Sequence, residues 1–163
     1  MRKQASLFAI AAMGAVTLLS ACNQQGESPA KVQADLAKSA ADGQKKVIDA
    51  QAKLDQVVAE TNKNIVGAEA DAQKQAATDP NAPSPAASVD VAKARKNAEN
   101  KVADAQYDVD KAKAEADRQV YEVRCKAEVA AQHDACMATA KANYESALAA
   151  AKTKSDAAHA ANQ

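Results

Sequence analysis

Cysteine and histidine are the side chains of this 163-residue chain that are best suited to metal binding or to covalent chemistry. Cys125, His133 and Cys136 lie close together in the sequence, and thiolate and imidazole ligands suit Zn²⁺ or Cu(I). No fourth ligand follows at the spacing of a structural zinc site, and a disulfide-bonded cysteine pair would not bind a metal. We therefore expect no metal and no cofactor, and interpret this cluster as a polar turn beside a disulfide.

The remaining cysteine, Cys22, follows a segment with the pattern of a secretory signal. Two basic residues begin the chain, an apolar run covers 5–19, and Leu19-Ser20-Ala21-Cys22 comes directly after it. The run is shorter than the roughly 20 residues of a transmembrane helix. The four-residue pattern resembles the lipobox of bacterial lipoproteins. That resemblance implies cleavage before Cys22, a thioether-linked diacylglycerol on its sulfur and, usually, an amide-linked third acyl chain such as palmitate.

Lipidation of Cys22 would make the membrane a binding partner of this chain. Each buried methylene contributes about 0.8 kcal/mol, so two or three acyl chains anchor a protein firmly. Residue 23 is asparagine and not aspartate, and similarity to enterobacterial sorting rules favours the outer membrane, facing the periplasm. We thus expect a removed signal peptide at 1–21 and a flexible tether at 22–30. Under the alternative of ordinary cleavage, Cys22 would be a free or disulfide-bonded cysteine.

If the protein is exported, Cys125 and Cys136 are expected to be oxidised to a disulfide in the oxidising compartment. On one continuous helix these residues would lie about 16.5 Å apart along the axis, whereas the Cα atoms of a disulfide lie within about 7 Å. An internal bond therefore requires the chain to turn back between them. Gln132-His133-Asp134 is the poorest helical stretch there, and Asp134 can cap a new helix, so we predict a turn at 131–134. Intermolecular disulfides in a homodimer of parallel helices are the alternative.

The residues around this pair resemble a motif found in small exported proteins of proteobacteria. The pattern is Tyr121-Glu-Val-Arg-Cys125, ten residues, and then Cys136-Met-Ala-Thr-Ala-Lys141-Ala-Asn-Tyr144. Proteins of that group are also rich in alanine and lysine, and commonly have glycine between the cysteines, which this chain lacks. The resemblance favours the internal disulfide and implies no defined activity.

Composition argues against catalysis and against nucleic-acid binding. From Cys22 onward the chain has two more acidic than basic residues, and the interspersed charges form no basic stripe. Carboxylates recur beside lysines on expected solvent faces, with no cavity that would raise a pKa for acid-base work. We find no Gly-rich phosphate loop and no serine or cysteine with a credible base partner. The chain is therefore predicted to have no catalytic residue and not to be an enzyme.

Alanine dominates the apolar residues, Trp is absent, and the single Phe lies in the signal segment. Such a chain cannot build a thick core, but alanine, lysine, glutamate and glutamine all favour helix. The prolines of 78–88 interrupt this pattern. We predict a long helix at 31–77, a Pro-rich linker at 78–88, a second long helix at 89–131 and a C-terminal helix at 134–160.

Small and aliphatic residues recur along both long helices in steps of three and four, which predicts a coiled-coil-like contact. The first stripe is Leu36, Ala40, Gly43, Val47, Ala50, Leu54, Val57 and Thr61, and the second is Ala98, Val102, Ala105, Val109, Ala112, Ala116, Val120, Val123 and Ala127. Tyr107 and Tyr121, two heptads apart, are either a binding stripe or larger residues that fill a thin interface. We predict an all-α, elongated helical hairpin or coiled-coil-like bundle. Alternatively, the proline segment joins two rods that pair with other chains.

Together these features predict a lipid-anchored cell-envelope protein that acts as a structural spacer, scaffold or protein-interaction rod. Its expected partners are the membrane, an envelope protein or a second copy, and not nucleic acid. The alternative is a periplasmic module that binds a ligand or a metal. The acylated cysteine followed by Ala-rich heptads resembles murein lipoprotein, but the chain ends Ala160-Ala161-Asn162-Gln163. It lacks the terminal lysine through which that family attaches to peptidoglycan.

Overall fold

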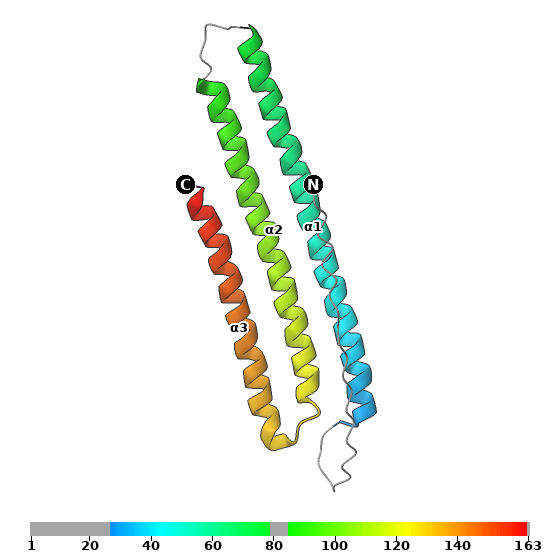
Figure 1. The fold of residues 1–163 in the computed structure, drawn as a ribbon. Coiled ribbons are helices and arrows are strands. Elements are labelled where there is room, and N and C mark those ends of the chain that lie inside the picture. The colour runs from blue at the N-terminus through cyan, green and yellow to red at the C-terminus, as the bar shows by residue number, and fades with distance from the viewer. Residues whose placement is uncertain (1–26, 79–84, 163) are drawn as a thin grey trace, which may run out of the picture.

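The protein is an elongated array of α-helices. The computed structural model describes residues 27–78 and 85–162, in which the helices are α1 (Pro29–Thr78), α2 (Pro85–Cys125) and α3 (Ala130–Ala161) (Figure 1). At 1.5 Å per residue they are about 75, 62 and 48 Å long. The predicted all-α fold, with two long helices and a shorter C-terminal one, is confirmed. Within these described ranges, none of the helices combines the length and the hydropathy of a membrane span.

Helix α2 is the central element of the array. It runs antiparallel to both α1 and α3 and lies between them (Figure 1). Both outer helices pack on α2, and in the described part of the chain they do not pack directly on each other. Because α3 is the shortest helix, it covers only part of α2, and the α1–α2 pair continues beyond the end of α3 (Figure 1).

The α1–α2 interface follows the stripes expected from the sequence. Gly43, Leu54 and Thr61 of the first stripe are buried, as are Ala98 and Val109 of the second. The intervening members are half-buried, apart from Ala40 and Ala127, which are exposed. Since the spacing of three and four keeps these residues on one side of each helix, the two sides can face each other along most of their length.

The buried side chains of α3 are smaller than those of α1, although Tyr144 and Leu148 of α3 are half-buried. Helix α3 contributes Ala140 and Ala151 to the buried residues. On α2, the buried Cys125 is bonded to Cys136, and the buried Ala114 lies one turn before Arg118, which contacts Tyr144 of α3. Alanine offers a single methyl group to an interface, so each contact removes little apolar surface from water. Helix α3 is therefore attached by thin, close packing.

The first two helices begin earlier than predicted. Helix α1 starts at Pro29 and not at residue 31, and the Val32 N–H donates to the Ser28 carbonyl at 3.0 Å. Helix α2 starts at Pro85 and not at residue 89, so the predicted linker 78–88 is too long. Proline is accepted in a first helical turn because its missing N–H has no helical partner there. Helix α1 also includes Thr78, one residue beyond its predicted end.

The turn between α2 and α3 is also misplaced in the sequence-based prediction. It covers 126–129 and not 131–134, so the predicted helices 89–131 and 134–160 have wrong bounds at this end. The N–H groups of residues 126–128 donate to the carbonyls three positions earlier, which tightens the chain without glycine. Asp134 consequently lies inside α3 and does not cap it, because Val129 occupies the N-cap position.

Candidate functional site

One end of the array combines the start of α1 with the α2–α3 turn. The backbone N–H of Glu27 donates to the Lys126 carbonyl at 3.3 Å. The Glu27 carboxylate accepts a hydrogen bond from Lys31 Nζ at 2.7 Å, which lowers the pKa of Glu27 and raises the pKa of Lys31. The predicted lipidation residue, Cys22, lies outside the described residues. It precedes Glu27 by five positions, and five extended residues span at most about 18 Å.

The disulfide lies at this same end. Cys125, the last residue of α2, is bonded to Cys136 in the second turn of α3, with their Cα atoms 5.5 Å apart. Both predicted disulfide residues are thus joined within one chain. Cys125 is fully buried and Cys136 is half-buried. His133 contacts Asp134 at 3.3 Å, and no three metal-ligating side chains of the described ranges converge on a common point.

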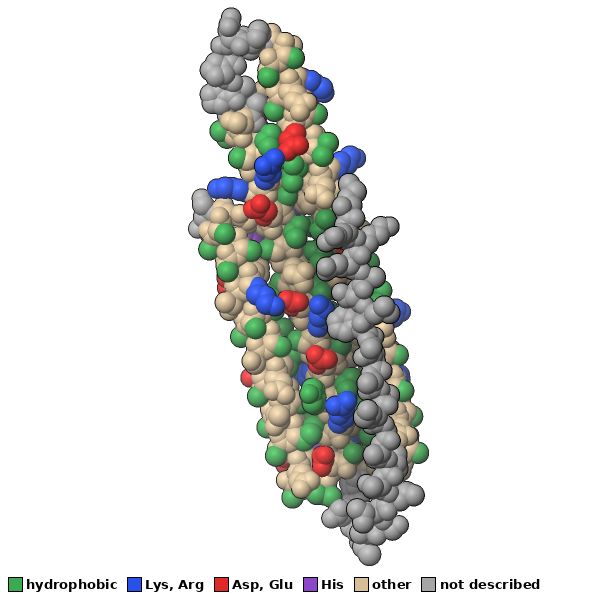
Figure 2. Space-filling model, viewed as in Figure 1, with side chains coloured by type: hydrophobic (Ala, Val, Ile, Leu, Met, Phe, Trp, Pro, Cys, Tyr) green, Lys and Arg blue, Asp and Glu red, His purple; other side chains and the backbone are tan. Residues whose placement is uncertain are grey.

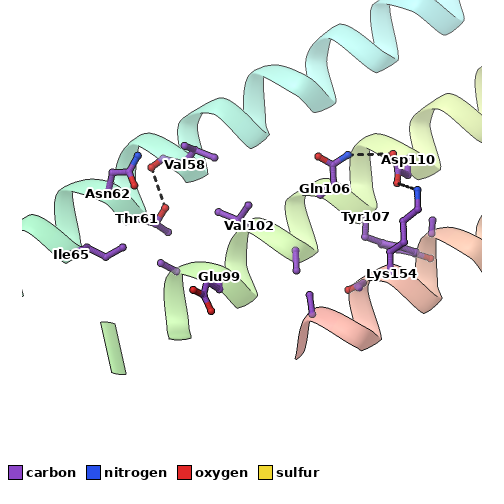
Figure 3. Close-up of a pocket in the computed structure, with 15 residues that line it drawn as sticks. Val58, Thr61, Asn62, Ile65, Glu99, Val102, Gln106, Tyr107, Asp110 and Lys154 are labelled. Carbon is purple, nitrogen blue, oxygen red and sulfur yellow. Dashed lines mark hydrogen bonds and ion pairs between the residues drawn. The ribbon is translucent and has the colours of Figure 1, made fainter. Parts of the chain in front are cut away.

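A groove lies where all the helices come together (Figure 3). It has a volume of about 490 Å³. Val58 and Ile65 line it from α1, Val102 and Tyr107 from α2, and Ala151 from α3. No sequence pattern indicated this groove, because it forms where α1 and α3 both approach α2 without closing on each other. Tyr107, which the sequence left as either a binding or an interface residue, is half-buried in its wall.

Some polar side chains of the groove are engaged with protein partners. Asp110 accepts hydrogen bonds from Gln106 Nε2 at 3.2 Å and from Lys154 Nζ at 3.4 Å (Figure 3). The buried Thr61 hydroxyl donates to the carbonyls of Val57 and Val58. The Thr61 hydroxyl and the Asp110 carboxylate therefore already have protein partners, and the apolar lining is suited to packing of apolar groups, while Glu99 also lines the groove.

Polar contacts fasten α3 along its length. The Arg118 guanidinium lies 4.6 Å from the centre of the Tyr144 ring. Beyond Lys154 and Asp110, His159 Nε2 lies 2.8 Å from an Asp104 oxygen, and Asn162 donates to Asn100 at 3.0 Å. These pairs follow one antiparallel register. They show that α3 ends beside Asn100, leaving the N-terminal part of α2 without it.

The part of α1 and α2 beyond the groove forms a two-helix projection, which we call the tip and define as residues 66–78 and 85–97. An ion pair between Arg95 and Glu69 at 2.7 Å joins its helices. Val66 and Val89 are 63% and 61% exposed there. On the face seen in Figure 2, acidic and basic side chains are interspersed along the rod. A partner that binds the tip would thus contact both small apolar and charged side chains.

Comparisons of the chain with protein-family models, with curated proteins and with solved structures find no match.

Proposed function

We propose that this protein is a lipid-anchored spacer of the cell envelope that holds a partner-binding tip away from the membrane. The observation that carries the proposal is the link between Glu27 and Lys126, which brings the start of α1 to the end formed by the α2–α3 turn. The tip lies at the opposite end (Figure 1). A lipid on Cys22 would therefore anchor one end and leave the other free.

The dimensions of α1 suit this role. Its 50 residues extend about 75 Å at 1.5 Å per residue. A rod of this length anchored by one end reaches far beyond the lipid headgroups into the envelope. The α1–α2 interface stiffens it, because residues from Val32 to Thr61 are buried at intervals along the helix. We propose a mechanical and binding role without catalysis, with an envelope protein as the partner of the tip.

Photo-crosslinking in cells tests this function. A photoreactive amino acid replaces Val89 at the tip or Glu128 at the turn, both of which are exposed. We expect the Val89 position to give a defined crosslink to an envelope protein, and the Glu128 position to give none to that protein. The same product from both positions, or none from either, would contradict the proposal.

A shortened rod tests whether the protein acts through its length or through the surface of its tip. Removing 66–78 together with 85–97 deletes the tip and shortens the hairpin by about 20 Å, while Ile65, Ala98 and the α3 contact remain. A second variant replaces the removed segments with an Ala/Lys/Glu hairpin of equal length. If spacing is the function, the equal-length variant restores envelope integrity. If the tip surface binds the partner, the equal-length variant, with the photoreactive amino acid at the position equivalent to 89, gives no crosslink to that partner.

The groove supports a second candidate function, binding of an apolar small molecule. Its volume of about 490 Å³ falls in the range of ligand pockets, and ligand pockets are mainly apolar. A ligand that binds only the folded state raises the melting temperature. This candidate predicts stabilisation by a member of a fatty-acid and aromatic-metabolite panel, lost in Tyr107→Ala and retained in Tyr121→Ala. Indifference of the melting temperature to the panel would count against it.

A further inference from the structure

The two helix pairs of this protein are held together by unequal means. Helix α1 contributes Val32 and Leu54 to the buried residues, whereas α3 contributes only alanines, Ala140 and Ala151. A buried alanine removes much less apolar surface from water than a buried valine or leucine. Helix α3 therefore depends more than α1 on links other than apolar packing.

The beginning of α3 is weakly supported by local interactions. Val129 occupies its N-cap position, with extended backbone and no side-chain hydrogen bond to the first turn. A helix without a polar N-cap leaves its first N–H groups without side-chain acceptors. Cys136 lies in the next turn, where its disulfide ties α3 to the end of α2.

Two of the polar links farther along α3 are exposed, whereas the Asn162–Asn100 hydrogen bond is part-buried. Lys154, which approaches Asp110, has a side chain that is 74% exposed, and the His159–Asp104 contact is also at the surface. Surface pairs of this kind contribute little to stability. Closing a loop the size of the one between Cys125 and Cys136 restrains the unfolded chain and favours the folded α2–α3 hairpin on the order of 100-fold. The disulfide is therefore the strongest single constraint on α3.

We propose that the Cys125–Cys136 disulfide is a redox-sensitive latch, and that its reduction by a dithiol releases α3 while α1 and α2 remain paired. The released helix would remove Ala151 and Lys154 from the groove. It would also uncover the side of α2 that carries Ala114, which is buried in the oxidised protein. The redox state would thus select which faces of α2 are available for contact.

The burial of the two cysteine residues sets the order of the reaction. The thiolate of the reductant attacks Cys136 Sγ, because Cys136 is half-buried and Cys125 fully buried. The S–S bond breaks, and Cys125 leaves as a thiolate that takes up a proton. The second thiol of the reductant then attacks the mixed disulfide and releases Cys136, which is protonated in turn. Two electrons pass to the protein, and the dithiol ends as a disulfide.

Hydrogen exchange followed by mass spectrometry tests the latch on the full-length chain in detergent micelles. The samples are the oxidised protein, the protein treated with dithiothreitol, and the Cys125→Ala/Cys136→Ala variant. We expect amides of 137–161 to exchange about 100-fold faster in the last two samples than in the first. Amides of 43–61 in α1 serve as the internal reference and should keep their rates. Dithiothreitol should not change the exchange of the double variant.

Three results would overturn the proposal. In the first, α3 stays as protected in the double variant as in the oxidised protein, so the disulfide does not hold it. In the second, α1 and α3 lose protection together, which would mean that the disulfide stabilises the whole fold and not α3 alone. In the third, α3 is released in the double variant but thiol alkylation shows that dithiothreitol does not reduce the folded protein. The bond would then be structural and not redox-sensitive.

Discussion

Gly43 of α1 lies directly against Ala116 of α2. A Cβ atom added at Gly43 would be 2.7 Å from the Ala116 Cβ, which is closer than real Cβ atoms approach, and 3.1 Å from its Cα, a tight contact. Glycine in a helix costs about 0.5 to 1 kcal/mol relative to alanine. The position of Gly43 shows what offsets this cost: the missing side chain allows the two longest helices to approach closely at a point nearer the α2–α3 turn than the tip.

The substitution Gly43→Ala should therefore destabilise the protein. The added methyl group would have to displace the α2 backbone, and overpacking of this kind costs about 1 to 3 kcal/mol. Gly67→Ala is the matched control, because no atom outside the local helix lies within 4 Å of its added Cβ. It should stabilise the protein by up to about 1 kcal/mol. Urea unfolding followed by circular dichroism measures both. Equal stabilisation by the two substitutions would show that the close approach is absent.

Val109→Ala should produce a cavity in the α1–α2 interface. Val109 is 0% exposed, and loss of two buried methyl groups together with the cavity left behind should reduce the free energy of unfolding by about 2 kcal/mol. Val89→Ala serves as the control, since Val89 is 61% exposed, and its effect should stay within about 0.5 kcal/mol. The same urea titrations measure this difference, and similar effects at the two positions would argue against a buried Val109.

Val129→Asp should stabilise α3. Aspartate at the N-cap can accept a hydrogen bond from the first-turn N–H groups that Val129 leaves without a side-chain acceptor, a gain of about 1 kcal/mol. Ala131→Asp adds the same charge within the first turn but cannot cap the helix, so it should recover only the smaller dipole contribution. Hydrogen exchange of the α3 amides distinguishes them. No difference between the two variants would mean that the N-cap position is wrongly placed.

The Glu27–Lys31 pair gives a pH dependence with a definite sign. Its hydrogen bond lowers the pKa of Glu27 from 4.5 and raises the pKa of Lys31 from 10.5. The Glu27 contribution to stability is present above pH 4.5 and is lost as pH falls through the lowered pKa. The Lys31 contribution is present below pH 10.5 and is lost as pH rises through the raised pKa.

An NMR titration of the Glu27 side-chain carboxyl carbon checks this pair. The midpoint should lie below 4.5 in the wild type and move up toward that value in Lys31→Ala. Lys38→Ala provides a control, because Lys38 forms no part of the Glu27 interactions. A midpoint that Lys31→Ala leaves unchanged would contradict the hydrogen bond.

The helical fold could be predicted from the sequence because its signals are periodic. Leu54 and Thr61 belong to a stripe with a regular spacing, and both are buried. The α2–α3 turn could not be placed in the same way. Low helix propensity at Gln132-His133-Asp134 favours a turn there. The turn instead forms at 126–129, through backbone hydrogen bonds that any residue type except proline can make.

The groove was missed for a different reason. Tyr107 and Ile65 are distant in the sequence and line a common surface only because α1 and α3 both pack on α2. A helical repeat indicates which residues of a helix face a neighbour, but it does not indicate that two neighbours leave a gap between them. The arrangement of three helices around such a gap is a tertiary property.

Lipidation of Cys22 is the central claim, because it determines which end of the rod is anchored. The decisive measurement is the intact mass of the detergent-extracted protein, compared with that of a Cys22→Ser variant. We expect the wild type to begin at Cys22 and to carry a diacylglyceryl group with or without a further acyl chain, and the variant to lack both cleavage and lipid. A wild-type chain that begins at another residue, or that begins at Cys22 with no added lipid mass, would contradict this account.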